Sequence, residues 1–98
     1  MKHERVNFAA VRFSSLQNLP ALLERWLPGG RYQGAEYVVR NPRRDDRRPG
    51  SFKINVRNGK WADFASGESG GDAIALAAYL FDLEPIEAAR RLREMLGE

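Results

Sequence analysis

The sequence predicts an α+β fold in which a small antiparallel sheet packs against an N-terminal helix and a C-terminal helical pair. Apolar and polar residues alternate from Ser51 to Arg57, which is the period of a strand, whereas apolar residues on either side of this region recur at helical spacing. A chain of 98 residues has the size of one domain. We therefore expect a single domain at 1–98, with an N-terminal arm and helix at 1–30, a basic β region at 31–66 and a helical pair at 67–98.

The first predicted element is a helix that begins near residue 19. Pro20 suits its first turn, a Ser or Asn at 14, 15 or 18 can cap it, and the Pro-Gly-Gly run at 28–30 ends it. Its apolar residues form one stripe and are predicted to be buried: Leu19, Leu22, Leu23, Trp26 and Leu27. The preceding segment, 6–13, fits either a strand or a docking arm.

The β region is predicted to begin with a short strand at 35–40 and a polar loop at 41–50. The alternating strand at 51–57 follows, and Asn58-Gly59 is typical of a two-residue turn leading to a returning strand at 60–64. In that register Val56 lies opposite Trp61 and Arg57 opposite Lys60. The hairpin would then bury one face, including Trp61, and present a basic one.

The helical pair begins after a glycine turn. Asp72 stands at the N-terminal end of an almost wholly apolar segment, 73–81, which must be a buried helix. Pro85 suits the first position of a last helix. Its predicted inward stripe is Ile86, Ala89, Leu92 and Leu96.

The charge of the chain is concentrated in its middle. Residues 31–60 hold nine Lys and Arg against three Asp and Glu, a net charge of +6, whereas the remainder holds seven against ten, a net charge of −3. A basic block in an otherwise acidic chain is typical of a protein that binds a polyanion, most often nucleic acid. A solvated arginine-rich loop without a partner is the alternative.

The candidate nucleic-acid contacts come from this basic block. Phosphates could be bound by Arg40, Arg43, Arg44, Arg47, Arg48, Lys53, Arg57 and Lys60, which suits DNA and RNA alike and gives affinity that falls with salt. Tyr32 and Tyr37 could stack on bases, although each is equally compatible with a place in the core. Asp45 and Asp46 could instead pair with the neighbouring arginines and weaken the patch.

No catalytic residues, metal site or cofactor are predicted. The chain has no cysteine and one histidine, which excludes disulfides and a thiolate zinc site, and its acidic residues lack the paired spacing of a nuclease or polymerase metal site. Neither a signal peptide nor an apolar run of the roughly 20 residues needed to span a bilayer is visible. We expect a non-catalytic cytoplasmic protein without a membrane partner.

The order of loop, hairpin, glycine turn and two helices over roughly residues 36–97 resembles the zinc-binding N-terminal domain of bacterial and phage DNA primases. Pro49-Gly50-Ser51-Phe52 is similar to the Pro-Ser-Phe element of that family, with one extra glycine, and Gly71-Asp72-Ala73-Ile74 matches the element that opens its buried helix. The family's four metal ligands correspond to Asn41, Arg44, Phe64 and Gly67, none of which binds zinc as a thiolate or imidazole.

The resemblance implies a degenerate, zinc-ribbon-like hairpin core without metal, in which Phe64 fills the space of the ion. It also implies binding of single-stranded DNA in the replication of a phage or mobile element.

The alternative function is a protein-interaction adaptor or dimerisation module. It would dock on a separate primase or helicase without touching nucleic acid. Phe8, Val11 and Phe13 favour this alternative because they lie outside the family-like region. Packing of residues 6–13 on their own domain would weaken it, and exchange between chains would strengthen it.

Overall fold

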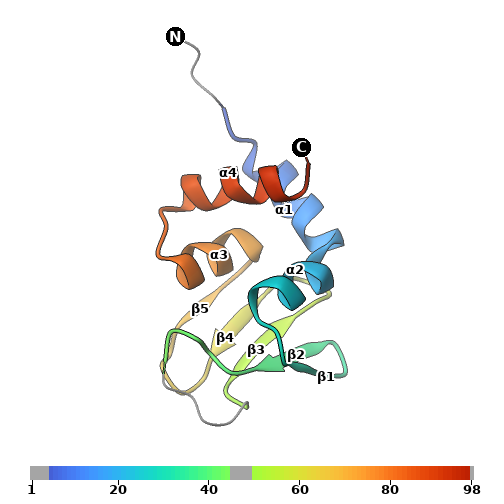
Figure 1. Ribbon diagram of the computed structural model, residues 1–98, viewed down its shortest axis with the longest axis vertical. Coiled ribbons are helices and arrows are strands. Elements are labelled where there is room, and N and C mark those ends of the chain that lie inside the picture. The colour runs from blue at the N-terminus through green and yellow to red at the C-terminus, as the bar shows by residue number, and fades with distance from the viewer. Residues whose placement is uncertain (1–4, 45–49, 98) are drawn as a thin grey trace.

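The computed structural model describes residues 5–44 and 50–97, and in these residues it has four helices and one five-stranded antiparallel sheet (Figure 1). The elements in chain order are α1 (Phe8–Gln17), α2 (Leu19–Trp26), β1 (Arg31–Gln33), β2 (Glu36–Val39), β3 (Phe52–Asn55), β4 (Trp61–Asp63), β5 (Ser69–Gly70), α3 (Ala73–Phe81) and α4 (Pro85–Met95). The strands lie in the order β1-β2-β3-β4-β5. The predicted α+β class is confirmed.

The segment at 6–13, predicted as a strand or an arm, belongs largely to helix α1. Asn7 caps this helix because its side-chain oxygen accepts a hydrogen bond of 3.0 Å from the Ala10 N–H. Val11 is 2% exposed, and α1 packs against α3 and α4 of the same chain. The segment therefore packs on its own domain, which weakens the adaptor alternative, although Phe13 is 64% exposed. Helix α2 follows directly, with Pro20 in its first turn.

The hairpin of β3 and β4 has a different register from the predicted one. Ile54 pairs with Trp61, so the connection is the four-residue loop 56–59 rather than a two-residue turn. The Asn55 side-chain oxygen accepts hydrogen bonds from the Arg57 and Asn58 N–H groups, and this local capping stabilises the longer loop. Gly59 closes it with φ +80°, a conformation that favours glycine.

Two further strands extend the sheet beyond the predicted ones. β1 pairs with β2 through a tight turn in which Gly34 has φ +61°. β5 pairs with β4 and lies inside the region that was predicted as a helical pair only. Both strands are short, which is why the alternation in the sequence did not reveal them.

The core lies between the helices and one face of the sheet (Figure 1). The sheet contributes Tyr37, Val39, Phe52, Ile54 and Trp61, so the prediction that Trp61 is buried is confirmed. On α4 the buried residues are Ala88, Ala89 and Leu92, whereas Ile86 is 39% exposed and does not belong to the inward stripe.

Helix α3 begins and ends as the sequence indicates. The Asp72 side chain accepts a hydrogen bond of 2.8 Å from the Ala75 N–H and caps the helix, which ends at Asp82 in the left-handed conformation with φ 54°. Within residues 5–44 and 50–97, no helix is both long and apolar enough to cross a membrane.

Candidate nucleic-acid interface

The helices cover one face of the sheet, and the residues between the core positions point to the other, which we call the outer face. In the register of the sheet Arg31, Val38, Lys53 and Ala62 lie side by side across four strands. Lys60 joins them because its carbonyl accepts the Asn55 N–H, which places it opposite Asn55. Among the described residues, three cationic side chains lie at these positions of the outer face: Arg31, Lys53 and Lys60.

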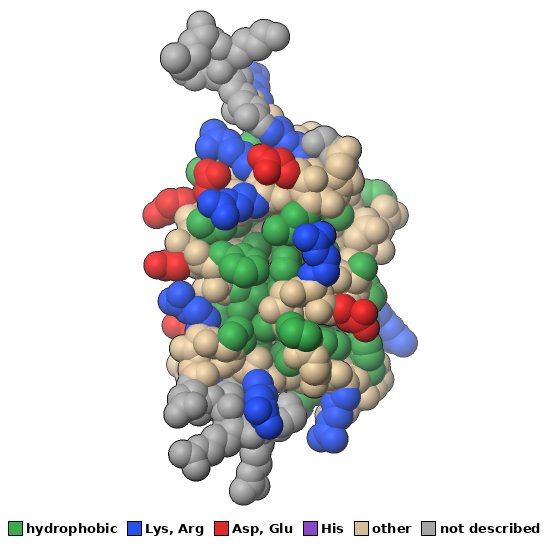
Figure 2. Space-filling model, viewed as in Figure 1, with side chains coloured by type: hydrophobic (Ala, Val, Ile, Leu, Met, Phe, Trp, Pro, Cys, Tyr) green, Lys and Arg blue, Asp and Glu red, His purple; other side chains and the backbone are tan. Residues whose placement is uncertain are grey.

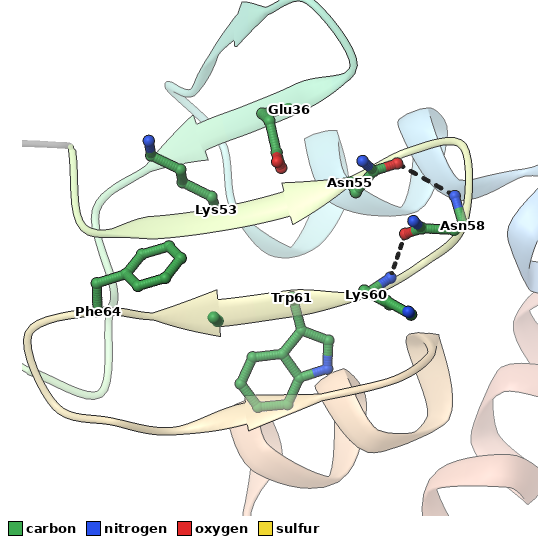
Figure 3. Close-up of a pocket in the computed structure, with 8 residues that line it drawn as sticks. Glu36, Lys53, Asn55, Asn58, Lys60, Trp61 and Phe64 are labelled. Atoms are coloured by element: carbon green, nitrogen blue, oxygen red, sulfur yellow. Dashed lines mark hydrogen bonds between the residues drawn. The ribbon is translucent and has the colours of Figure 1, made fainter.

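A shallow hollow of about 240 Å³ lies on the outer face (Figure 3). Its lining combines polar and apolar side chains: Glu36, Lys53, Asn55, Asn58, Lys60, Trp61, Ala62 and Phe64. Asn58 is held in place because its side-chain oxygen accepts a hydrogen bond of 2.9 Å from the Lys60 N–H. Glu36 adds one acidic group to this basic surface.

Phe64 is the most exposed aromatic side chain at the hollow. It is 73% exposed, and its ring centroid lies 6.0 Å from the Lys53 Nζ atom (Figure 3). The expectation that Phe64 fills the space of a lost metal is wrong. Strand alternation explains the difference, because Asp63 points into the core and the next residue must then point out. The Phe64 N–H donates a hydrogen bond of 2.9 Å to the Ser51 carbonyl, which keeps this end of the sheet paired.

A polar cluster around Asp63 lies on the inner side of the sheet. Asp63 is 0% exposed and accepts hydrogen bonds from the Asn41 Nδ2 (2.7 Å) and the Arg44 Nε (2.7 Å). Asn41 also donates a hydrogen bond of 2.8 Å to the Tyr79 hydroxyl, and Arg44 donates one of 2.9 Å to the Ser51 hydroxyl. Asn41 and Arg44 occupy the positions that the primase resemblance assigns to the first ligand pair, and in this chain they bind a carboxylate.

Burial raises the pKa of Asp63, but the hydrogen bonds from Arg44, Asn41, the Ala65 N–H and Ser51 outweigh burial and hold that pKa well below its ordinary value. Asp63 is therefore ionised, and Arg44 serves as its counter-ion. The predicted phosphate contact of Arg44 stays a prediction, but the structure places its guanidinium on Asp63 and not with the cations of the outer face. A guanidinium committed to a buried carboxylate has a structural role.

The two tyrosines predicted to stack on bases lie away from the outer face. Tyr37 is 3% exposed. Its hydroxyl donates a hydrogen bond of 2.6 Å to the Leu27 carbonyl and accepts one of 3.1 Å from the Gly30 N–H. Tyr32 is 47% exposed but packs edge-on against Tyr37, with ring centroids 5.2 Å apart, on the inner side of the sheet. The stacking prediction is wrong for Tyr37, and Tyr32 is not brought together with the basic residues of the outer face.

The other predicted cations lie outside the strands. Arg40 follows β2 and Arg57 lies in the hairpin loop, and both are exposed. Arg43 is also exposed, with its guanidinium 5.6 Å from the Tyr79 ring centroid on the inner side. The remaining two predicted contacts, Arg47 and Arg48, lie outside the described residues, as do Asp45 and Asp46.

The outer face thus unites two predicted cations, Lys53 and Lys60, with two residues that sequence reasoning missed, Arg31 and Phe64. Phe64 was assigned to the core, although extending the alternation of Trp61 and Asp63 by one residue would have placed it outside. Among the described residues, no three His, Cys, Asp or Glu side chains are grouped as a metal ion requires. No known protein-family model matches the sequence, and a search of curated proteins finds no significant match.

Proposed function

We propose that the protein is a non-catalytic module that binds single-stranded nucleic acid on the outer face of its sheet, with single-stranded DNA in replication as the expected target. The observation that carries this proposal is Phe64, an aromatic ring 73% exposed beside Lys53 on the face that the helices leave uncovered. Base stacking on such a ring contributes about 1–3 kcal/mol per base and tolerates any sequence.

The arrangement favours an unpaired strand over a duplex. A base can reach the Phe64 ring only when it is unstacked from its neighbours, which a single strand allows and a duplex resists. The cations Arg31, Lys53 and Lys60 are spread over the same face and would follow the phosphates. The Glu36 carboxylate lines the hollow and repels phosphate, so we expect bases rather than backbone at that point.

Two properties of the sequence support the proposal independently of Phe64. The segment 31–60 has a net charge of +6, which provides the long-range attraction that nucleic-acid binding requires. The resemblance to the primase zinc-binding domain points to the same class of ligand. A cytoplasmic location, where such a template would be met, is part of this proposal.

The test is fluorescence anisotropy of a labelled single-stranded oligonucleotide and its duplex, titrated with the protein at two salt concentrations. Phe64→Ala should weaken single-strand binding by about 5- to 150-fold, the equivalent of one lost stacking contact. The matched control is Phe13→Ala, because Phe13 is also a highly exposed phenylalanine (64%) but lies on α1. This control should leave the affinity unchanged.

Charge reversal tests the second half of the interface. Replacing Lys53 and Lys60 by Glu should abolish binding at moderate salt and reduce the dependence of affinity on salt. Both side chains project from the sheet without a described hydrogen bond, so the fold should survive, as circular dichroism would verify. The proposal fails if the protein does not bind single strands at low salt, or if the Phe64 and Phe13 variants bind equally well.

A further inference from the structure

Three polar residues lie side by side at one end of the outer face. Glu36 on β2 pairs with Asn55 on β3, and the Asn55 N–H donates a hydrogen bond of 2.8 Å to the carbonyl of Lys60, which directly precedes β4. All three line the hollow of the outer face, and the Glu36 carboxylate is directed toward β3 (Figure 3). We call these three residues the polar row.

The polar row is separate from the stacking position at Phe64. Phe64 lies four residues beyond Lys60, a distance of about 13 Å along a strand. No single base spans that length, so a strand bound on the outer face places different nucleotides at the two positions. Stacking on Phe64 does not discriminate between bases, whereas hydrogen bonds from a base edge to the polar row do.

The polar row presents one acceptor group and two donor groups. The Asn55 side-chain oxygen accepts hydrogen bonds of 2.8 Å from the Arg57 N–H and 3.2 Å from the Asn58 N–H, which leaves the Nδ2 group of Asn55 as a donor held in a fixed orientation. Among the described residues, the side chains of Glu36 and Lys60 form neither a hydrogen bond nor an ion pair. A carboxylate that only accepts therefore lies beside an amide and an ammonium that donate.

Guanine is the DNA base whose edge matches this row. Its Watson–Crick edge presents two adjacent donors, N1–H and the N2 amine, next to the O6 acceptor. A carboxylate accepts two parallel hydrogen bonds from such a pair of donors, and an amide and an ammonium suit O6. Adenine and cytosine present one donor beside an acceptor, and thymine presents one donor between two acceptors, so each of them turns an acceptor toward the carboxylate.

We propose that the polar row selects guanine in the bound strand and that Glu36 determines this specificity. Glu36 accepts from N1–H and the N2 amine, and Asn55 and Lys60 donate to O6. The inference rests on the proposed function, because it requires a single strand on the outer face. It also gives a positive role to an acidic side chain that would otherwise only weaken a phosphate-binding surface.

The test is fluorescence anisotropy at low salt with labelled oligothymidylates of about eight nucleotides. One strand carries thymine throughout, and the others carry a single guanine, adenine, cytosine or hypoxanthine at the centre. Guanine should raise the affinity about 5- to 150-fold over thymine, which is the discrimination that one bidentate pair provides. Hypoxanthine lacks the N2 amine and should lose most of this gain, and adenine and cytosine should not produce it.

Glu36→Gln keeps the size of the side chain but replaces one acceptor oxygen by a donor. It should abolish the preference for guanine without weakening the binding of the all-thymine strand. The matched control is Glu24→Gln, which removes the same charge from an exposed position on α2. The surface over α2 and α3 is of a different kind, with apolar side chains gathered at its centre (Figure 2), and this control should keep the preference. Binding of the all-thymine strand verifies that both variants are folded.

The outcomes distinguish this inference from the proposed function. If none of the strands binds at low salt, the proposed function fails and the selection of guanine fails with it. If the strands with guanine and with thymine bind equally well, the proposed function stands and the selection of guanine is overturned. A preference that persists in Glu36→Gln, or that is lost equally in Glu24→Gln, would overturn the role of Glu36.

Discussion

Replacing Arg44 by Met removes the counter-ion of a buried carboxylate while keeping the apolar stem of the side chain. In the native protein Arg44 donates to both Asp63 oxygens, at 2.7 Å and 3.2 Å, and to the Ser51 hydroxyl at 2.9 Å. Asp63 itself is 0% exposed. The variant therefore leaves an ionised group in the core with fewer donors, and we expect it to be substantially less stable.

The size of the stability loss in Arg44→Met depends on the hydrogen bonds that the Asp63 carboxylate retains. Breaking a buried ion pair costs about 3–5 kcal/mol. Asp63 retains the Asn41 amide at 2.7 Å and the Ala65 N–H at 2.9 Å, and the Arg44 side chain is 29% exposed, so we expect a cost below that range, about 2–3 kcal/mol. Since the shift of the urea midpoint is this loss divided by the m-value, about 1.5 kcal/mol/M for a domain of this size, the midpoint should fall by about 1–2 M.

The stability lost in Arg44→Met should be larger at neutral pH than at acidic pH. The folded state holds the pKa of Asp63 below the value of about 3.9 found in unfolded chains. The stability provided by the Arg44–Asp63 pair is therefore complete above the unfolded pKa and declines as pH falls toward the folded one. In Arg44→Met burial raises the pKa with less opposition, so the gap between wild type and variant should narrow below about pH 4.

Urea denaturation followed by tryptophan fluorescence at about pH 7 and about pH 3 measures both effects. Arg40→Met is the matched control, since Arg40 is exposed and the change should alter stability by less than about 0.5 kcal/mol. Equal stability of wild type and Arg44→Met at neutral pH would refute the reasoning. So would a destabilisation that is the same at both pH values.

Two further changes test other contacts of the fold. Tyr37→Phe removes the buried hydroxyl that donates a hydrogen bond to the Leu27 carbonyl. It should lower the free energy of unfolding by about 1–2 kcal/mol, measured in a thermal melt. An unchanged melting temperature would show that water replaces the hydrogen bond. Asp72→Ala removes the cap on the Ala75 N–H and should lower the free energy of unfolding, measured by calorimetry, by about 1 kcal/mol. Asp72→Asn can still cap the helix and should lower it much less. Equal losses of stability in the two variants would assign the effect to the ion pair between Asp72 and Arg12.

The helices were predictable because short local signals define their ends. Pro20, Asp72 and Pro85 each stand in or directly before the first turn of a helix in the structure. Helix α1 was missed although Asn7 is an ordinary N-cap, because its apolar residues, including Phe13 at 64% exposure, do not form a single inward stripe. A local cap without a periodic pattern does not distinguish a helix from an arm.

The register of the hairpin depends on which of two local signals sets the turn, and the composition of the segment does not decide between them. Asn58-Gly59 is a strong two-residue turn signal, but the Asn55 side chain captures the N–H groups of Arg57 and Asn58 and draws two more residues into the loop. Side chains keep their faces after a shift of two residues, so Phe52 and Ile54 remained in the core as predicted.

The candidate site was predictable in charge but not in detail. The basic block placed Lys53 and Lys60 correctly on the polar face of the strands, because alternation alone fixes that face. The fate of Arg44 depends on Asp63, nineteen residues away, and no local pattern reports such a pairing. Buried charge partners of this kind become visible only when the chain is folded.

A sheet in which every strand pairs with its successor closes only the loops between consecutive strands as it forms, the longest of them at 40–51. Such loops cost little chain entropy, and topologies dominated by them fold rapidly. Helix α1, in contrast, meets α3 across a long stretch of chain, as the Arg12–Asp72 contact with its separation of 60 residues illustrates. We therefore expect the sheet to assemble early and α1 to dock last, which makes α1 the first element to detach when the native state opens.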